Sequence, residues 1–137
     1  MIIIYIGAIF CALITAIALL RTKTPYHLFA DRQLAIFLLA ASYCVFLYVL
    51  VDSGEIVNFP HFFKTAGPVN FILPPLSYLY VRAVLKNEAK FKKTDWLHGI
   101  PFVIILFNYL PFYFYSSTAK IEIIANIGVD KWNGTGF

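Results

Sequence analysis

The residues that can carry chemistry are few in this chain and lie far apart. His27, His61 and His98 fall in three different polar stretches, so they lack the close ligand spacing typical of a zinc site. His61 shares its stretch with Asp52 and Glu55, and these three side chains could hold a metal ion only weakly. We favour a solvated loop for that stretch, and we predict neither a metal nor a cofactor.

Recognisable enzymatic motifs are also missing from the sequence. Cys11 and Cys44 lie near the centres of two apolar runs, where a thiol has no easy route to the reactive thiolate, so we interpret them as packing residues. The chain contains no phosphate-binding glycine loop, Cys-x-x-Cys pair, His-Glu-x-x-His motif or Gly-x-Ser-x-Gly motif. We therefore expect no enzymatic activity within these residues.

A proline pair is the first candidate functional feature. Pro74 and Pro75 lie near the middle of an apolar run. A proline cannot donate a hydrogen bond to the carbonyl four residues earlier, here Asn70 or Phe71, and it disfavours helical geometry in the preceding residue. The pair predicts a kinked or broken helix, in which Ser77 can donate to a freed carbonyl. We favour a structural kink over the binding site that a broken helix can mark in transporters.

The second candidate is a basic cluster that follows the same run. Its members are Arg82, Lys86, Lys90, Lys92 and Lys93. Arg82 is predicted to be an interfacial anchor whose charge reaches the headgroups, and the lysines favour a loop on an anionic membrane surface. Docking of a cytoplasmic output domain is the alternative. Attraction to such a surface contributes about 1 kcal/mol per basic residue, so we hypothesise that the cluster is a cytoplasmic coupling loop that moves during signalling.

Both candidates lie among long charge-free stretches. The chain is 61% apolar and 13% charged, whereas soluble domains are about 25% charged. Apolar runs of about 17–25 residues match the hydrocarbon core of a bilayer. The sequence predicts an all-α, polytopic transmembrane helical bundle with four spans, the third kinked or broken at the proline pair. The predicted spans are residues 2–20, 34–51, 68–86 and 97–115.

These spans form one predicted membrane region, residues 1–119. Residues 120–137 are expected to be an outer-face tail or the start of the next loop, in a chain that continues beyond Phe137. Small residues at a spacing of four, Ala8, Ala12 and Ala16, favour close helix packing. Static packing inside the bundle is the preferred interpretation of this stripe, and self-association is the alternative.

Lysine and arginine are divided unequally between the gaps. Of the eleven, three lie in the first gap (Arg21, Lys23 and Arg32), and the third gap holds the five members of the basic cluster. Cytoplasmic loops carry an excess of basic residues. We therefore predict that residues 21–33 and 86–95 are cytoplasmic, and that residues 52–66 and the N-terminus lie outside. The predicted location is the bacterial inner (cytoplasmic) membrane, with Trp96, Tyr113 and Tyr115 as aromatic interface anchors.

Two other interpretations of the charge and the N-terminus are less favoured. The net charge of +4 is compatible with nucleic-acid binding, but the basic residues adjoin apolar runs, so lipid headgroups are the nearer partner. A cleaved signal peptide would need basic residues before its apolar core, whereas Arg21 and Lys23 follow it. The lipid bilayer is the expected partner of these residues.

The order of features resembles one known family. The resemblance rests on five segments: residues 20–23, residues 31–35, Gly67-Pro68, residues 73–82 and residues 93–102. Within them, Pro-Leu-x-Tyr-Leu-Tyr-Val and Asp-x-Leu-His-x-x-Pro-Phe are the most specific runs. Together they are similar to the N-terminal membrane region of bacterial membrane-anchored AraC-type helix-turn-helix transcriptional regulators, over about residues 5–125. The resemblance implies further membrane helices and a cytoplasmic DNA-binding domain outside this chain.

The sequence thus predicts the N-terminal sensor and anchor part of a membrane-bound transcriptional regulator, which takes part in signal transduction. DNA would be bound only by a domain that these residues do not contain. A fragment of a transporter or channel is one alternative, prompted by the proline pair and by Asn70 and Asn108 within apolar runs. The membrane part of a sensor histidine kinase is another, since related membrane regions are fused to such kinases. A small membrane scaffold protein is a third.

Overall fold

The described part of the chain is built of helices. The computed structural model describes residues 2–22, 28–86 and 90–132, with only the backbone described at 128–132. In chain order the elements are α1 (Ile2–Arg21), α2 (Leu28–Asp52), η1 (Glu55–Val57), η2 (Pro60–Phe62), α3 (Ala66–Asn70), α4 (Leu73–Lys86), η3 (Lys93–Gly99), α5 (Ile100–Tyr113) and α6 (Ser117–Trp132), where η marks a 3₁₀ helix. No strand occurs within these ranges, which confirms the predicted all-α class.

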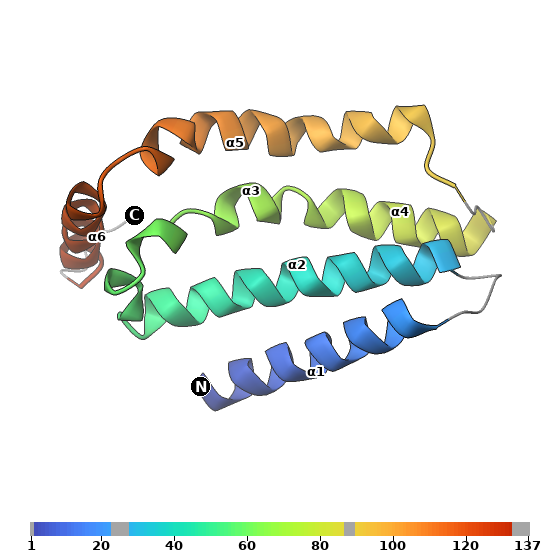
Figure 1. Cartoon of the computed structure of the whole chain (residues 1–137), viewed down its shortest axis with the longest axis horizontal. Helices are drawn as coiled ribbons and strands as arrows, with labels where there is room; N and C mark the ends of the chain where they lie inside the picture. The colour runs from blue at the N-terminus through green and yellow to red at the C-terminus, as the bar shows by residue number, and fades with distance from the viewer. Residues whose placement is uncertain (1, 23–27, 87–89, 133–137) are drawn as a thin grey trace.

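The long helices α1, α2, α4 and α5 lie side by side and alternate in direction, as Figure 1 shows. α1 packs on α2, α2 packs on α3 and α4, and α5 contacts α3 and η3. The described helix ends that border the two basic gaps therefore fall at one end of the bundle, where Arg21, Lys86 and Lys93 lie; we call it the basic end. The opposite end holds η1, η2 and α6, which lies across the end of α5 (Figure 1). Because alternate gaps meet at the same end of the bundle, the unequal distribution of lysine and arginine along the chain makes one end more basic than the other.

Three helical segments are long and apolar enough to cross a membrane. Within the described residues they are Ile2–Arg21, Leu28–Asp52 and Lys93–Tyr113. A 20-residue helix is about 30 Å long, which matches a bilayer core. Large apolar side chains cover their outer faces, and Ile3, Phe10 and Phe107 are each more than half exposed. Such a surface would be costly in water but suits lipid, so the chain is a membrane protein.

The third predicted span, residues 68–86, is broken rather than one long helix, as the proline pair indicated. α3 ends at Asn70, Phe71 and Ile72 form a turn, and α4 begins at Leu73. α4 has 14 residues, which gives about 21 Å at 1.5 Å per residue. The expectation of four spans is therefore not confirmed, because this helix alone is too short to cross.

Proline chemistry explains the position of the break. Pro74 and Pro75 lack the N–H groups that would continue a helix from α3 into α4. Phe71 and Ile72 instead donate to the carbonyls of Pro68 and Val69, three residues back. The Ser77 hydroxyl donates to the Pro74 carbonyl at 2.9 Å, rather than to the freed carbonyls that the sequence indicated.

Other boundaries also differ from the sequence prediction. α2 begins at Leu28 instead of residue 34, because its first turns continue through the charged Asp31 and Arg32. Residues 120–137 were expected to be a tail or loop, yet most of them belong to α6. The Ser116 hydroxyl accepts the Ala119 N–H at 3.4 Å and so caps the start of this helix. The predicted bounds marked where charged residues occur, but a helix ends where its backbone hydrogen bonds end. The two limits therefore need not coincide.

A close approach of α3 and α5 fixes the centre of the bundle. A methyl group added at Gly67 would overlap the ring of Tyr109 on α5. At Gly7 on α1, by contrast, an added methyl group would meet nothing within 4 Å. Gly67 therefore lets the broken helix lie directly against α5.

We predict that Gly67→Ala destabilises the fold by about 1–3 kcal/mol, the usual cost of inserting a methyl group into a packed contact. Gly7→Ala is the matched control and should be neutral or slightly stabilising, since alanine favours helix more than glycine does. Reversible unfolding in mixed micelles, followed by circular dichroism, measures both. Adding Tyr109→Leu to Gly67→Ala should recover stability. Equal unfolding of the two alanine variants would disprove this close contact.

Candidate functional site

A buried ion pair joins α4 to η3 at the basic end. The Arg82 guanidinium donates through Nη1 and Nη2 to the two carboxylate oxygens of Asp95, at 2.5 and 2.7 Å. Arg82 is 9% exposed and Asp95 is 3% exposed. Two parallel charge-assisted bonds of this kind fix both the separation and the orientation of the two side chains. We call this pair the clamp.

Local backbone contacts hold the acidic partner in place. The Lys92 N–H donates to Asp95 Oδ2 at 2.7 Å, and the Asp95 N–H donates to the Lys92 carbonyl at 3.0 Å. This turn starts η3, which leads directly into α5 at Ile100. Asp95 therefore stabilises the first turn of its own helix and also binds the neighbouring helix.

The clamp corrects the sequence interpretation of Arg82. A snorkelling anchor would direct its guanidinium to the headgroups, but this guanidinium is buried and bound to Asp95. Its neutralisation by a carboxylate is the usual solution for an arginine near the membrane interior. Arg82 is thus a link between two helices, whereas Lys86, Lys90 and Lys93 of the cluster are exposed.

Two aromatic side chains extend the clamp along the same face. The Arg82 guanidinium carbon lies 5.7 Å from the centroid of the Tyr78 ring, one turn earlier on α4. The Tyr78 ring lies 5.1 Å from the imidazole ring of His98 on η3. Arginine above an aromatic ring is a favourable cation–π arrangement. α4 and η3 are therefore joined over two successive side-chain contacts.

A cavity of about 560 Å³ opens beside the clamp. Its walls come from α2, α4, η3 and α5, and they include Leu76, Leu79, Trp96 and Val103. Pro75, at the start of α4, also lines it. The few polar residues in its wall are Gln33, His98 and the clamped Asp95. The cavity is therefore an apolar groove inside the basic half of the bundle.

The other predicted site residues lie at the two ends of the bundle. Lys86, Lys90, Lys92 and Lys93 are exposed at the basic end. Trp96 is also exposed there, as expected for an interface anchor. At the opposite end Tyr115 is half exposed. Tyr113 is partly buried, and its hydroxyl donates to the Lys64 carbonyl at 3.4 Å.

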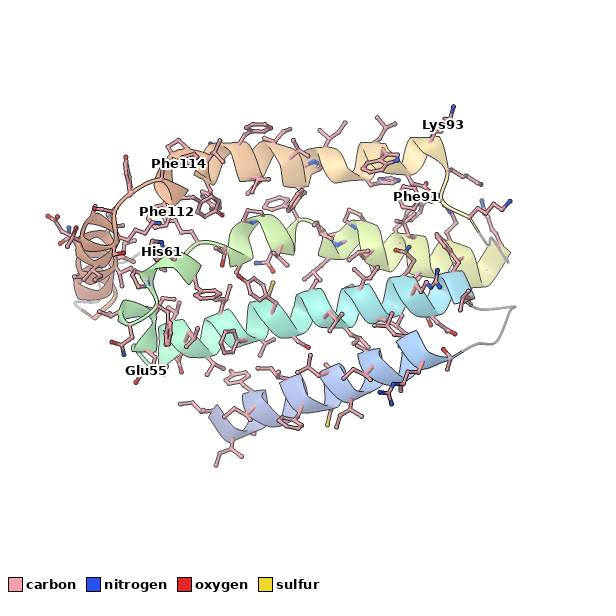
Figure 2. The ribbon with its side chains drawn as sticks, in the orientation of Figure 1. Glu55, His61, Phe91, Lys93, Phe112 and Phe114 are labelled. Atoms are coloured by element: carbon pink, nitrogen blue, oxygen red, sulfur yellow. The ribbon has the colours of Figure 1, made fainter. Side chains whose placement is uncertain are left out.

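A second polar cluster at the opposite end was not predicted. Lys120 of α6 is 1% exposed, and its ammonium group donates to the Tyr113 carbonyl at 2.9 Å and to His61 Nδ1 at 3.0 Å. An ammonium group can only donate, so Nδ1 accepts, and Nε2 of a neutral His61 donates to the Ser117 hydroxyl at 3.0 Å. These bonds join η2 to α6, as the labelled His61 in Figure 2 illustrates.

Aromatic faces complete the surroundings of the two lysines at this end. The ammonium groups of Lys64 and Lys120 lie 4.9 and 5.5 Å from the centroid of the Phe112 ring. Lys64 adopts a positive φ of 65°, which is uncommon for a residue with a side chain. No carboxylate pairs with either lysine within the ranges that the structure describes. The ammonium groups are instead stabilised by cation–π attraction to Phe112 and by neutral hydrogen-bond acceptors.

The described residues contain no set of three or more histidine, cysteine, aspartate or glutamate side chains that could hold a metal. The weakly considered combination of His61 with Asp52 and Glu55 does not form, because His61 binds Lys120 and Ser117. Cys11 and Cys44 are free thiols on separate helices. His27 lies outside the described residues. The best-defined candidate site is thus the clamp with its adjoining groove.

We predict that removing one charge of the clamp is far more harmful than removing both. Asp95→Asn or Arg82→Met should each cost about 3–5 kcal/mol, because each leaves a buried charge uncompensated. The double variant should be more stable than either single variant, since no buried charge remains. Asp31→Asn is the control, because Asp31 makes only an exposed contact with Thr22.

Unfolding free energies in mixed micelles measure all four proteins. If each single variant unfolds like the Asp31→Asn control, the clamp contributes nothing to the fold. If the double variant is as unstable as the sum of the single ones, the two charges do not interact.

Comparisons with known proteins leave the family open. No protein-family model, no curated protein and no solved structure matches the chain. Its function is therefore inferred from its own residues.

Proposed function

We propose that these residues are the N-terminal membrane sensor and anchor part of a membrane-bound transcriptional regulator. The AraC-type resemblance in residues 73–82 and 93–102 motivates the output, and the three apolar helices support the anchor. In this proposal the protein is multi-pass in the bacterial inner membrane, and a DNA-binding domain follows residue 137. The gathering of the basic gaps at one end of the bundle supports a cytoplasmic basic end and an outside N-terminus.

A fourth crossing is part of the same proposal. α3 and α4, with the two-residue turn between them, run from Ala66 to Lys86. That combined length is enough for a span even though α4 alone is too short. A broken segment is tolerated at membrane depth where neighbouring protein covers its backbone, and here α2 and α5 lie beside it.

The clamp is the observation that supports a sensor rather than a passive anchor. The turn at Phe71–Ile72 separates α3 from α4, and in this proposal it is the hinge about which α4 tilts relative to α3. The clamp makes α4 and η3 move together, because Arg82 and Asp95 are joined by two bonds. A shift of α4 would therefore change the direction of α5 and the position of the lysines between them. This revises the coupling-loop hypothesis: the moving unit is α4 with η3.

A transporter or channel fragment is less well supported by the geometry. Broken helices do mark substrate sites in transporters. Here the groove beside the break has apolar walls, and the carboxylate that lines it is already bound to Arg82. Such a groove offers a polar substrate few partners. The output of the full-length protein is what separates a transcriptional regulator from a sensor histidine kinase.

The predicted orientation can be tested with single cysteines in a Cys11→Ala, Cys44→Ala background. Ser53 and Thr94 are exposed at opposite ends of the bundle. A membrane-impermeant maleimide should label Ser53→Cys in intact cells and Thr94→Cys only after lysis. The reverse pattern would place the N-terminus inside the cell.

The proposed output can be tested in cells that produce the tagged full-length gene product. Formaldehyde crosslinking and immunoprecipitation of the membrane fraction should recover discrete chromosomal sites, because the DNA-binding domain is expected beyond residue 137. Residues 1–137 with the same tag serve as the control and should recover none. If the full-length protein recovers no DNA and instead transfers phosphate from ATP to itself, the kinase alternative is correct.

A further inference from the structure

We propose that the groove between α4 and α5 is a binding site for one acyl chain of an anionic phospholipid, whose headgroup contacts Lys90 and Lys93. The site requires only that the chain lies in a membrane. It therefore stands or falls independently of the proposed role in transcription.

The shape of the groove follows from how α5 is held. α5 is fixed to α3 at Gly67 and to the rest of the bundle through η3 and the clamp. Between these two attachments the cavity of about 560 Å³ is lined by residues of both α4 and α5. That volume falls within the range of about 300–1,000 Å³ that is typical of ligand sites. In a membrane such an open space must be filled by lipid or protein.

The chemistry of the walls selects an apolar occupant. Leu76 and Leu79 of α4 and Phe102 and Val103 of α5 all line the groove. The Asp95 carboxylate is turned to Arg82 and to the Lys92 N–H, so it offers little to a polar ligand. A hydrocarbon chain leaves no polar group of its own unsatisfied in this space.

The residues near the basic end of the groove favour an anionic headgroup. The rings of Phe91 and Trp96 line the groove and lie edge to face, 6.0 Å apart. Lys90 and Lys93 are exposed and lie close to these residues in the chain, and Figure 2 shows Lys93 on the outer surface of the basic end and Phe91 on its inner side. An apolar groove with aromatic rings in its wall and lysines on the adjoining end of the bundle complements a phosphate headgroup joined to an acyl chain. We infer a phospholipid with net negative charge rather than a zwitterionic one.

Occupancy of this site would act on the coupling unit. The groove is bounded by Pro75, where α4 begins, and by η3, which carries Asp95. A chain seated there supports the separation of α4 and α5, and an empty groove would favour their closure. The lipid composition of the membrane would thus bias the position of α4.

The test uses brominated lipids, which quench tryptophan on contact. The chain has two tryptophans, so Trp132→Phe leaves Trp96, in the wall of the groove, as the only reporter. The protein is reconstituted into phosphatidylcholine vesicles that contain equal fractions of brominated phosphatidylglycerol or brominated phosphatidylcholine. We expect phosphatidylglycerol to bind more tightly, by about fivefold for each contacting lysine. The Lys90→Gln, Lys93→Gln variant should reduce this ratio to near one.

A second variant distinguishes the groove from the surrounding lipid. Gly99 lines the groove, and a β-carbon added there meets nothing within 4 Å, so Gly99→Leu should place its side chain in the groove. It should abolish the preference for phosphatidylglycerol, whereas the matched variant Gly7→Leu on α1 should retain it. Circular dichroism verifies that each variant keeps its helical content.

Three outcomes would overturn the proposal. Equal quenching by the two lipids in the parent chain would exclude headgroup selection. An unchanged preference in Gly99→Leu would mean that the lysines attract lipid to the general surface and not to the groove. A full-length gene product that shows no preference, while residues 1–137 show one, would mean that another helix covers the groove.

Discussion

The placement of one charged side chain determines much of this fold. Arg82 lies on α4 close to the apolar part of the bundle, where an unpaired guanidinium is expensive. Asp95 neutralises it, and Asp95 can do so only if the chain folds back so that η3 lies against α4. That return sets where α5 begins. The groove between α4 and α5 lies between this ion pair and the close contact at Gly67.

The two ends of the bundle bury cations in different ways. At the basic end Arg82 is matched by a carboxylate in a bidentate arrangement. At the opposite end Lys120 is surrounded by a carbonyl, a neutral imidazole and the face of Phe112. A planar guanidinium fits a carboxylate with little freedom, whereas an ammonium group can be satisfied from several directions. The clamp is therefore the more rigid link, and the contact between η2 and α6 is the more adaptable one.

The elements of the fold were more predictable than its contacts. Apolar run length indicated α1, α2 and the helix that ends at Tyr113, and the prolines indicated the break before α4. The pairing of Arg82 with Asp95 was missed, because hydropathy and charge order carry no information on which side chains meet across a turn. The sequence did hold one signal, since Asp95 is the acidic residue at the start of an apolar run that follows a basic stretch. α6 was missed because its apolar residues follow no clear helical period.

Two fixed contacts and one helix break follow one another between the opposite end of the bundle and the basic end. The contact at Gly67 holds α3 against α5, the turn at Phe71–Ile72 interrupts the helix, and the clamp fixes α4 to η3. A uniformly rigid helix would move as a whole, and a fully flexible segment would transmit nothing. In the proposed coupling, a hinge between two fixed contacts lets α4, the helix that borders the groove, tilt relative to α3. What occupies the groove, and not only what reaches the opposite end, would then bias that tilt.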